Sequence, residues 1–376
     1  MKAINRRSFL GLLSAGWLAF RSGRTHAQPQ QLDAQASPDK RPPEETRQPK
    51  KPPLEGAVWA ADTENELEET YFWASDQQAL FLQHVPESLY FQALLVDAGS
   101  GRKTLPEAFN ARFSALLTAK IMHVRFADDP NRHETHYLPP KCALSPDGKW
   151  LVWLSQNQKW IAARLDAADK VEWPRAGKTV PGFALWMFDS RHWVECVEDY
   201  HNDAFTIPRA IFHDLEAPRA NQTVQFTGLP DGLPLGITHD NHVLLYKQDF
   251  ADRTTRKVKP QVDFYEASLD GESASVRDYS ISWPQSMRVW DMALSRQGDR
   301  LAWRLMPDDL ERATCEIWTS DLRGEARRKI GQVKNLTRLT GDRSIRSPFP
   351  VKLRWLPDGK RLSFLYDNAL WTVPVD

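Results

Sequence analysis

The amino-acid sequence predicts an all-β fold, a six-bladed β-propeller of four-stranded antiparallel blades. An apolar strand, a polar turn and a second apolar strand recur six times, with turns at Asp76, Asp147, Asp189, Asp240, Gln297 and Asp358. A third strand follows each of these strand–turn–strand units, so that units and third strands alternate strictly along the chain. The intervals between the turns are 71, 42, 51, 57 and 61 residues, which is typical of four-stranded blades with loop insertions.

The strands follow from local chemistry. In residues 142–154 a Pro-Asp-Gly turn separates two apolar runs, as in a β-hairpin. Residues 355–364 repeat this unit, residues 294–303 keep its glycine, and weaker copies surround the other three turns. The third strands are predicted at residues 90–97, 160–166, 210–216, 264–271, 316–324 and 370–376. A six-hairpin sandwich or a solenoid is the alternative fold.

Two further elements complete the predicted fold. Residues 55–61 are strand-like and precede the first repeat, and we expect them to supply the outer strand of the last blade, which closes the ring and protects its sheet edges. The segment 105–117 has a spacing that suits an amphipathic helix on one rim, with apolar side chains at Leu105, Phe109, Phe113, Leu116 and Leu117. A surface strand followed by a loop is the alternative for this segment.

The composition is that of a folded soluble protein. Of 376 residues, 41% are hydrophobic and 26% are charged, unlike a disordered chain or an integral membrane protein. Lys and Arg number 49, as do Asp and Glu, and no basic stripe follows the first 50 residues, which disfavours a nucleic-acid partner. The 15 tryptophans are an excess, and we expect them to pack between blades.

Two motifs resemble the TolB-like, WD-type propeller repeats, which also form the non-catalytic propeller of the prolyl oligopeptidase family. They are the turn from Ser145 to Leu151, Ser-Pro-Asp-Gly-Lys-x-Leu, and the third strand from Ile317 to Gly324, Ile-Trp-x-x-Asp-Leu-x-Gly. The resemblance covers roughly residues 70–376 and implies a propeller, a scaffold with many uses. A proline-rich segment stands where TolB carries an α/β domain, and the repeats are not followed by a hydrolase domain.

The start of the sequence resembles a twin-arginine export signal. The resemblance rests on Arg6, Arg7, Phe9 and Leu10. The apolar run over residues 9–20 is too short to span a bilayer, and cleavage is expected between Ala27 and Gln28. The resemblance implies a folded protein exported to the periplasm or outside the cell, without a stable transmembrane segment after cleavage. A chance Arg-Arg pair and an uncleaved anchor are the alternatives.

Three parts are therefore expected: a signal peptide at 1–27, a proline-rich disordered tether at 28–54, and the propeller at 55–376. Removal of residues 1–27 takes five basic and no acidic residues and leaves 44 basic against 49 acidic ones. The mature protein is mildly acidic, which further disfavours nucleic acid. We expect a monomer.

Motifs for several chemistries are missing from the sequence. Neither the Gly-x-Ser-x-Gly pentapeptide of serine hydrolases nor a glycine-rich nucleotide-binding loop occurs. Cys142, Cys196 and Cys315 are far apart in apolar runs, so they are expected to be buried free thiols, although one pair could still form a disulfide. We expect no cofactor.

Histidines provide the only metal-ligand candidates. His133, Glu134 and His136 form the densest set, with His123 upstream, since imidazole and carboxylate suit zinc or copper. Their spacing is not that of a metalloprotease, and a solvated loop is the favoured interpretation. Five further histidines, His192, His201, His213, His239 and His242, are scattered over two repeats, and their placement is read as chance.

Two classes of function are compatible with the sequence. The first is a non-enzymatic binding or scaffold module that presents its loops and central funnel to an envelope protein, peptide or glycan. The alternative is a propeller hydrolase, a lactonase or glycan-active enzyme, with a site at the tunnel mouth. The residues just before the turns are mostly apolar or carry hydroxyl groups, which favours the binding module and predicts no catalytic residue.

Replacing Arg6 and Arg7 by Lys tests the export signal. We expect uncleaved precursor to accumulate in the cytoplasm, because the twin-arginine route requires the arginine pair. Cell fractionation followed by immunoblotting measures this. Unchanged secretion of the double variant would refute the assignment.

Overall fold

The computed structural model describes residues 51–63, 70–125, 133–175, 183–201, 204–218, 222–227, 232–248, 250–252, 257–307, 314–334 and 350–375. The export residues Arg6, Arg7, Phe9 and Leu10, the cleavage residues Ala27 and Gln28, and residues 28–50 of the tether lie outside them. Contacts between residues divide the chain into two units. Residues 52–124 and 134–376 form the larger unit, which contains the blades. No helix in the described part of the chain has both the length and the apolar character that crossing a membrane requires.

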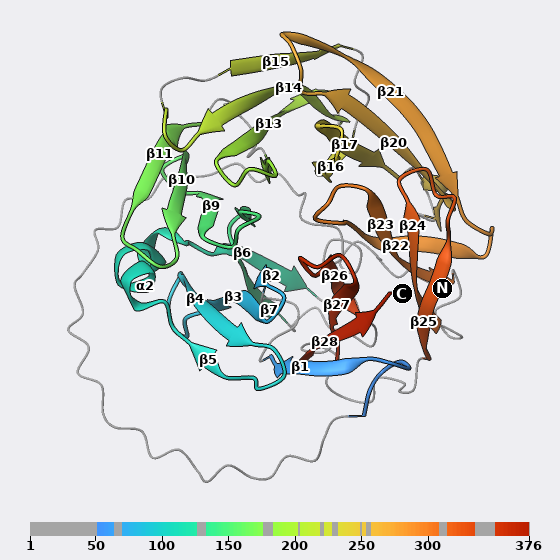
Figure 1. Cartoon of the computed structure of the whole chain (residues 1–376), viewed down its shortest axis with the longest axis horizontal. Coiled ribbons are helices and arrows are strands. Elements are labelled where there is room, and N and C mark those ends of the chain that lie inside the picture. The colour runs from blue at the N-terminus through green and yellow to red at the C-terminus, as the bar shows by residue number, and fades with distance from the viewer. Residues whose placement is uncertain are drawn as a thin grey trace. The chain divides into compact units, whose positions relative to one another are not determined.

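Six four-stranded antiparallel sheets form the blades of a β-propeller, which confirms the predicted fold class (Figure 1). Blade 1 contains β2 (Thr70–Ser75), β3 (Gln78–His84), β4 (Phe91–Asp97) and β5 (Lys103–Thr104). Blade 2 contains β8 (Cys142–Leu144), β9 (Trp150–Leu154), β10 (Lys159–Arg164) and β11 (Lys170–Pro174). Blade 3 contains β12 (Phe183–Trp186), β13 (His192–His201), β14 (Ala204–Asp214) and β15 (Gln222–Thr227).

Blade 4 contains β16 (Leu233–Ile237), β17 (His242–Lys247), β20 (Gln261–Ser268) and β21 (Ser273–Ser282). Blade 5 contains β22 (Met287–Leu294), β23 (Arg300–Pro307), β24 (Thr314–Asp321) and β25 (Arg328–Lys334). Blade 6 contains β26 (Val351–Trp355), β27 (Arg361–Leu365), β28 (Ala369–Pro374) and β1 (Val58–Asp62). Two extra hairpins are β6 (Lys120–Arg125) with β7 (His133–Leu138), and β18 (Phe250–Asp252) with β19 (Lys257–Val258). All six predicted turns join the first two strands of a blade, and all six predicted third strands are present.

The ring is closed by the first strand. β1 pairs antiparallel with β28, and Val58 lies opposite Thr372, so the predicted completion of the last blade is confirmed. Side chains seal the junction between blades 6 and 1: the Tyr71 hydroxyl donates to the carbonyl oxygen of Lys352 at 2.8 Å, and Trp73 Nε1 donates to Ser363 Oγ at 2.7 Å. Closure therefore joins residues from the two ends of the described chain.

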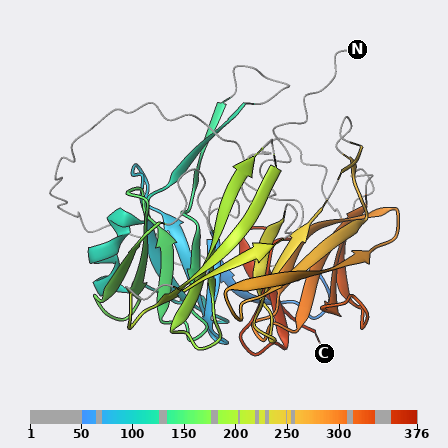
Figure 2. The same ribbon diagram turned by 90° about the horizontal axis from the view of Figure 1, so that it is seen from above.

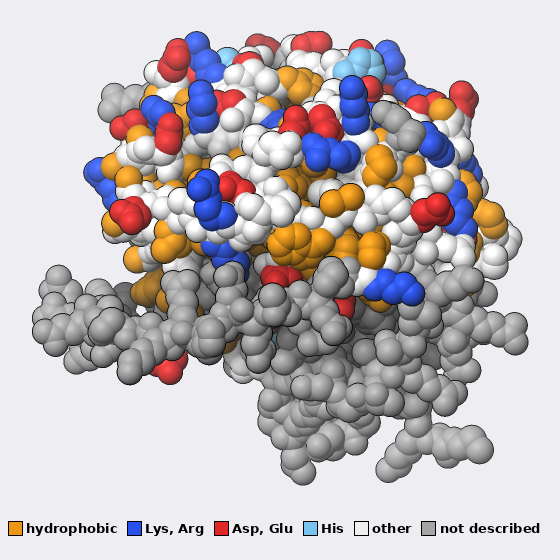
Figure 3. All heavy atoms as spheres, turned by 60° about the horizontal axis from the view of Figure 1, so that its bottom comes forward, with side chains coloured by type: hydrophobic (Ala, Val, Ile, Leu, Met, Phe, Trp, Pro, Cys, Tyr) orange, Lys and Arg blue, Asp and Glu red, His pale blue; other side chains and the backbone are white. Residues whose placement is uncertain are grey.

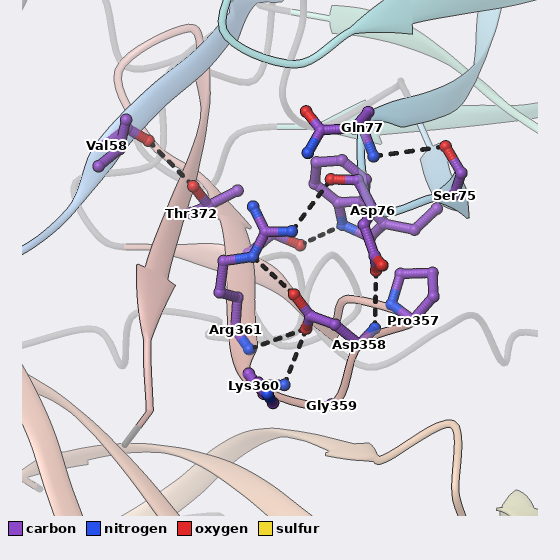
Figure 4. A network of polar contacts seen from close by, with 12 residues as sticks. Val58, Ser75, Asp76, Gln77, Pro357, Asp358, Gly359, Lys360, Arg361 and Thr372 are labelled. Atoms are coloured by element: carbon purple, nitrogen blue, oxygen red, sulfur yellow. Dashed lines mark hydrogen bonds and ion pairs between the residues drawn. The ribbon is translucent and has the colours of Figure 1, made fainter.

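The turns between first and second strands also contact one another around the ring. At the closing junction the backbone N–H of Asp358 donates to Asp76 Oδ1 at 2.7 Å, and Arg361 bridges Asp358 to the carbonyl oxygen of Asp76 (Figure 4). The N–H of Asp147 likewise donates to Ser190 Oγ at 2.8 Å. Each turn is thus fixed by its neighbour as well as by its own strands.

Apolar side chains fill the spaces between blades. Six tryptophans are almost completely buried, as predicted from their excess, namely Trp153, Trp160, Trp173, Trp193, Trp303 and Trp371. The segment after blade 1 is helical, in α2 (Glu107–Phe113) and the 3-10 turn η1 (Ser114–Leu116), which confirms the helix over the strand alternative. Phe109 and Phe113 pack against Trp153 of blade 2. Leu105, in contrast, is exposed.

One pairing was not predicted. The outer strands β15 and β21 pair in parallel, so that blades 3 and 4 form one eight-stranded sheet. The blades are seen from the side in Figure 2. On the face shown in Figure 3, basic and acidic side chains of the described residues are interspersed.

Two glycines with positive φ allow a test of the turn contacts. A Cβ on Gly148 would lie 2.2 Å from the carbonyl oxygen of Ala74 in the neighbouring turn, whereas a Cβ on Gly271 would have nothing within 4 Å. We expect Gly271→Ala to lower the free energy of unfolding by about 1 kcal/mol, the cost of the left-handed conformation, and Gly148→Ala to lower it by roughly 3 kcal/mol or more, because the clash adds to that cost. Urea titration measures both. Equal losses would contradict the role of the turn contact.

Candidate functional site

Blade 3 carries the candidate site. A cavity of about 310 Å³ lies where the turn between β12 and β13 meets the end of β14 and the start of β15. It is lined by Met187, His192, Phe212, His213, Asp214 and Gln222. The register of the β13–β14 hairpin builds this wall, because it places His192 opposite Asp214 and Trp193 opposite His213. Apolar and polar groups therefore share one small hollow.

Asp214 is held by an arginine fork. Arg191 Nε donates to Asp214 Oδ1 at 2.8 Å, and Nη2 donates to Oδ2 at 2.6 Å. Arg191 Nη1 also lies 2.7 Å from Glu216 Oε2. The hydrogen bonds from Arg191 hold the pKa of Asp214 well below its ordinary value, and the backbone N–H of Glu216 adds to this effect. Asp214 is thus a fixed carboxylate in the cavity wall.

His192 lies between two carboxylates. Its Nδ1 is 2.5 Å from Asp189 Oδ2, and its Nε2 is 3.5 Å from Asp214 Oδ2. Asp189 Oδ1 also accepts the backbone N–H groups of Arg191 and His192. Burial raises the pKa of Asp189, but these hydrogen bonds outweigh burial and lower the pKa below its ordinary value. The turn therefore fixes the position of the imidazole ring.

A second histidine is completely buried beneath the cavity. His213 Nε2 lies 3.3 Å from Glu195 Oε2, and both side chains are 1% exposed. The His213 ring stacks on Trp193 with 4.1 Å between ring centroids. Its other nitrogen, Nδ1, is buried and has no hydrogen-bond partner among the described residues. An unpaired buried polar atom costs about 1–3 kcal/mol. Successive residues of β14 point to opposite faces of the sheet, so the His213 ring lies in the tryptophan cluster with Trp173 and Trp193, whereas Asp214 lies on the other face.

The structure brings together histidines that sequence reasoning treated as scattered. His192 and His213 lie on neighbouring strands and both border one cavity. That their placement is chance stays a prediction. Counting outward from the β13–β14 turn would place His192 opposite His213. The β-bulge between Val197 and Asp199 shifts the register by one residue and places His192 opposite Asp214. No single motif in the sequence marks this pairing.

The predicted metal candidates lie on β7. His136 is buried, and the side chains of His133 and Glu134 fall outside the described residues. Among the side chains that the structure describes, no three His, Cys, Asp or Glu residues come close enough together to hold a metal ion. The solvated loop expected here is wrong, because residues 133–138 form strand β7, which pairs with β6. A metal at His133, Glu134 and His136 stays the untested alternative.

The inner strands of the blades are mostly apolar, as expected, but β22 and β26 carry charged residues, Arg288, Asp291, Lys352 and Arg354. Asp291 accepts the backbone N–H of Leu353 on β26 at 3.0 Å. The guanidinium of Arg354 lies over the ring of Phe72 on β2, 4.7 Å from its centroid. These charged residues lie further from the turns than the residues on which the expectation rests.

The three cysteines are free, so no pair forms a disulfide. Cys196 and Cys315 are buried as expected, while Cys142 is only partly buried. Burial raises the pKa of the Cys315 thiol to about 12, and the positive charge of Arg304 opposes this shift. Such a thiol stays protonated at neutral pH.

No family model matches the chain, and no curated protein matches it. Solved structures similar to it include an oligogalacturonate lyase in complex with manganese, with 12% identity, a TM-score of 0.41, and coverage of 86% of this chain and 92% of that chain. The tricorn protease has 11% identity, a TM-score of 0.44, and coverage of 88% and 35%. A prolyl endopeptidase has 10% identity, a TM-score of 0.43, and coverage of 81% and 46%. Likeness at this level carries no argument about function.

The lowered pKa of Asp214 gives a pH dependence of stability. A carboxylate whose pKa is lowered by folding stabilises the folded protein at pH values above the ordinary pKa of that carboxylate, which is 3.8 for Asp214. This stabilisation is lost as the pH falls through the pKa of the folded state. We expect the difference in unfolding free energy between wild type and Asp214→Asn to be constant above about pH 5 and to narrow below about pH 4. Urea titrations across this range measure it, with the exposed Asp278→Asn as control. A difference in unfolding free energy that does not change with pH would contradict the lowered pKa of Asp214.

Proposed function

We propose that the protein is a β-propeller, exported to the periplasm or outside the cell, that binds a polar group of an envelope peptide or glycan in the blade 3 cavity. The observation that carries this proposal is the cavity itself, about 310 Å³ in volume, whose wall holds the fixed carboxylate of Asp214 beside the apolar side chains of Met187 and Phe212. A polar group of a ligand could hydrogen-bond to Asp214 Oδ2 while its apolar part packs on these two side chains.

The size of the cavity limits the ligand. Cavities for small molecules usually measure about 300–1,000 Å³, and this one, at about 310 Å³, is at the lower end. It therefore accommodates one sugar ring or one amino-acid side chain. We infer that the rest of a larger partner lies on the surrounding turns, which the inter-turn hydrogen bonds hold in fixed positions.

The place of action follows from the sequence. The pattern of Arg6, Arg7, Phe9 and Leu10 supports export by the twin-arginine route, with cleavage between Ala27 and Gln28. We also propose that the repeats are TolB-like and that the protein acts as a monomer. Export would bring it to a partner in the cell envelope.

A propeller hydrolase is the second candidate, and one observation favours it. His192 is flanked by Asp189 and Asp214 at the cavity, and a histidine oriented by a carboxylate can act as a general base. However, the turn of blade 6 pairs Asp358 with Arg361 at the same spacing. A contact between the turn aspartate and the residue three positions later thus also occurs in blade 6, where it only stabilises the turn. The Asp189–His192 contact is therefore weak support for catalysis, and binding is the better supported function.

Site-specific cross-linking tests the binding function. A photo-reactive amino acid at Gln222, an exposed residue of the cavity wall, is expected to form adducts in the envelope fraction, and Asp214→Asn in the same protein is expected to reduce them severalfold, because it alters the cavity. The control places the same amino acid at Asp278, which is exposed on β21 outside the cavity. Adducts are measured by mass spectrometry.

Two outcomes would contradict the proposal. One is an adduct yield at Gln222 no higher than at Asp278. The other is turnover of a lactone or sugar ester that is abolished in His192→Gln, which would establish the hydrolase instead. In both cases a circular dichroism melt would show that the variants fold.

A further inference from the structure

We infer that Arg354 binds the C-terminal carboxylate of a peptide at the centre of the ring, with an aliphatic side chain of that peptide beside it. Arg354 lies on β26, the first strand of blade 6, and the first strands of the blades surround the centre of the ring (Figure 1). The site is separate from the blade 3 cavity, so the inference does not rest on the proposed function.

Arg354 is a charged residue at a level of the ring that is otherwise uncharged. It belongs to the second residue pair from the turn of its blade. In blades 2 to 5 the same position of the first strand holds an apolar residue or glycine, namely Ala143, Leu185, Gly236 and Ala293. All five residues are partly exposed, so water reaches the centre of the ring at this level. Packing alone does not call for an arginine here, because four other blades do without a charge.

The guanidinium of Arg354 has aromatic neighbours but no acceptor. It lies 4.7 Å from the ring centroid of Phe72 and 5.6 Å from that of Tyr71, both on β2 of blade 1. Its Nε is buried without a hydrogen-bond partner, and none of its side-chain nitrogens donates to a residue that the structure describes. An aromatic face attracts a cation, but the five N–H groups of a guanidinium still need acceptors. This set of donors is therefore available to a ligand.

Two buried arginines of blade 5 show how the fold treats arginines that have only a structural role. Arg288 and Arg304 are 4% and 3% exposed. Both donate from their terminal nitrogens to main-chain carbonyl oxygens, those of Gln285 and Met287 for Arg288, and those of Pro350 and Trp290 for Arg304. Arg354 has no such bond, although it lies on the adjoining blade.

The charge of the first strands favours an anion. In the described structure these six strands carry three basic residues, Arg288, Lys352 and Arg354, and one acidic residue, Asp291. Asp291 is held by the backbone, because its Oδ1 accepts the N–H of Met292 and its Oδ2 accepts the N–H of Leu353. Two positive charges on these strands are thus left unbalanced, and they attract a negatively charged group.

A β-bulge sets the position of Arg354. The register of β26 against β27 shifts between Val351 and Arg354, and Lys352 has a φ of 56°. This left-handed conformation is strained for a residue other than glycine. The Tyr71 hydroxyl donates to the carbonyl oxygen of Lys352 at 2.8 Å and so holds the bulge. Bulges re-aim side chains and are frequent next to functional sites.

A carboxylate is the anion that fits this position. Its two oxygens accept two parallel N–H groups from one guanidinium, and one arginine balances its single charge. The side chains of Phe72, Ala143, Leu185 and Ala293 suit an aliphatic group next to the carboxylate, and they offer no hydrogen bond to the hydroxyl groups of an acidic sugar. A peptide that ends in an aliphatic residue combines both features.

Four probes separate charge, shape and ligand class: N-acetyl-leucine, the uncharged N-acetyl-leucinamide, glucuronate and inorganic phosphate. Saturation-transfer NMR with the full exported protein at pH 7 measures the Kd of each. We expect N-acetyl-leucine to bind with a roughly millimolar Kd, and the other three probes to bind at least about tenfold more weakly. N-acetyl-leucine is also expected to shift the Nε–H signal of Arg354, and added salt to weaken its binding.

Variants locate the probe at Arg354. Arg354→Gln is expected to weaken N-acetyl-leucine binding more than tenfold, and Arg354→Lys severalfold, because lysine keeps the charge but loses the planar fork. The matched control is Arg102→Gln, at an arginine that is 77% exposed on blade 1, and it is expected to change nothing. Because the Arg354 side chain has no acceptor in the described protein, Arg354→Gln is expected to leave the urea midpoint unchanged.

Several results would overturn the inference. N-acetyl-leucinamide binding as tightly as N-acetyl-leucine would show that the carboxylate is not recognised, and this comparison needs no variant. Unchanged binding in Arg354→Gln would place the probe elsewhere. Glucuronate or phosphate binding as tightly as N-acetyl-leucine would contradict the peptide terminus as the ligand. None of these results bears on cross-linking at the blade 3 cavity, which tests the proposed function separately.

Discussion

The rest of the structure depends on the pairing of β1 with β28. This pairing completes blade 6, whose strands come from opposite ends of the described chain. In every other blade the four strands follow one another in sequence, and their hairpins form from local contacts. The last blade has Val58 opposite Thr372. Without this pairing the outer edge of β28 would be open, and Tyr71 and Trp73 would lose their partners across the junction with Ser363.

Closure of the ring also holds the turns of neighbouring blades together, and one of these turns carries the candidate site. The Asp358 turn is hydrogen-bonded to Asp76, and the Asp147 turn to Ser190, which belongs to the same turn as Asp189 and Arg191. The arginine fork on Asp214 and the ring of His192 start from this turn. The cavity wall is therefore built on a turn whose position the ring of blades holds.

Much of the fold follows from local sequence patterns, while the site does not. The strands, the turns and the helix over 107–113 were predictable because alternating apolar residues, Pro-Asp-Gly turns and helical spacing act over a few residues. The parallel pairing of β15 with β21 depends on the approach of two outer strands from different blades. The pairing of His192 with Asp214 could not be predicted because it depends on the register of β13 and β14, which a bulge shifts. The other partner of His192, Asp189, resembles the aspartates of the other turns.

The most direct test of the central claim is a crystal structure of the exported protein purified from its own cells, at a resolution that shows ordered ligands. The claim is that the blade 3 cavity is a binding site in which Asp214 contacts the ligand. The predicted result is electron density for a bound group within hydrogen-bond distance of Asp214 Oδ2. A cavity filled by the protein's own side chains would contradict it.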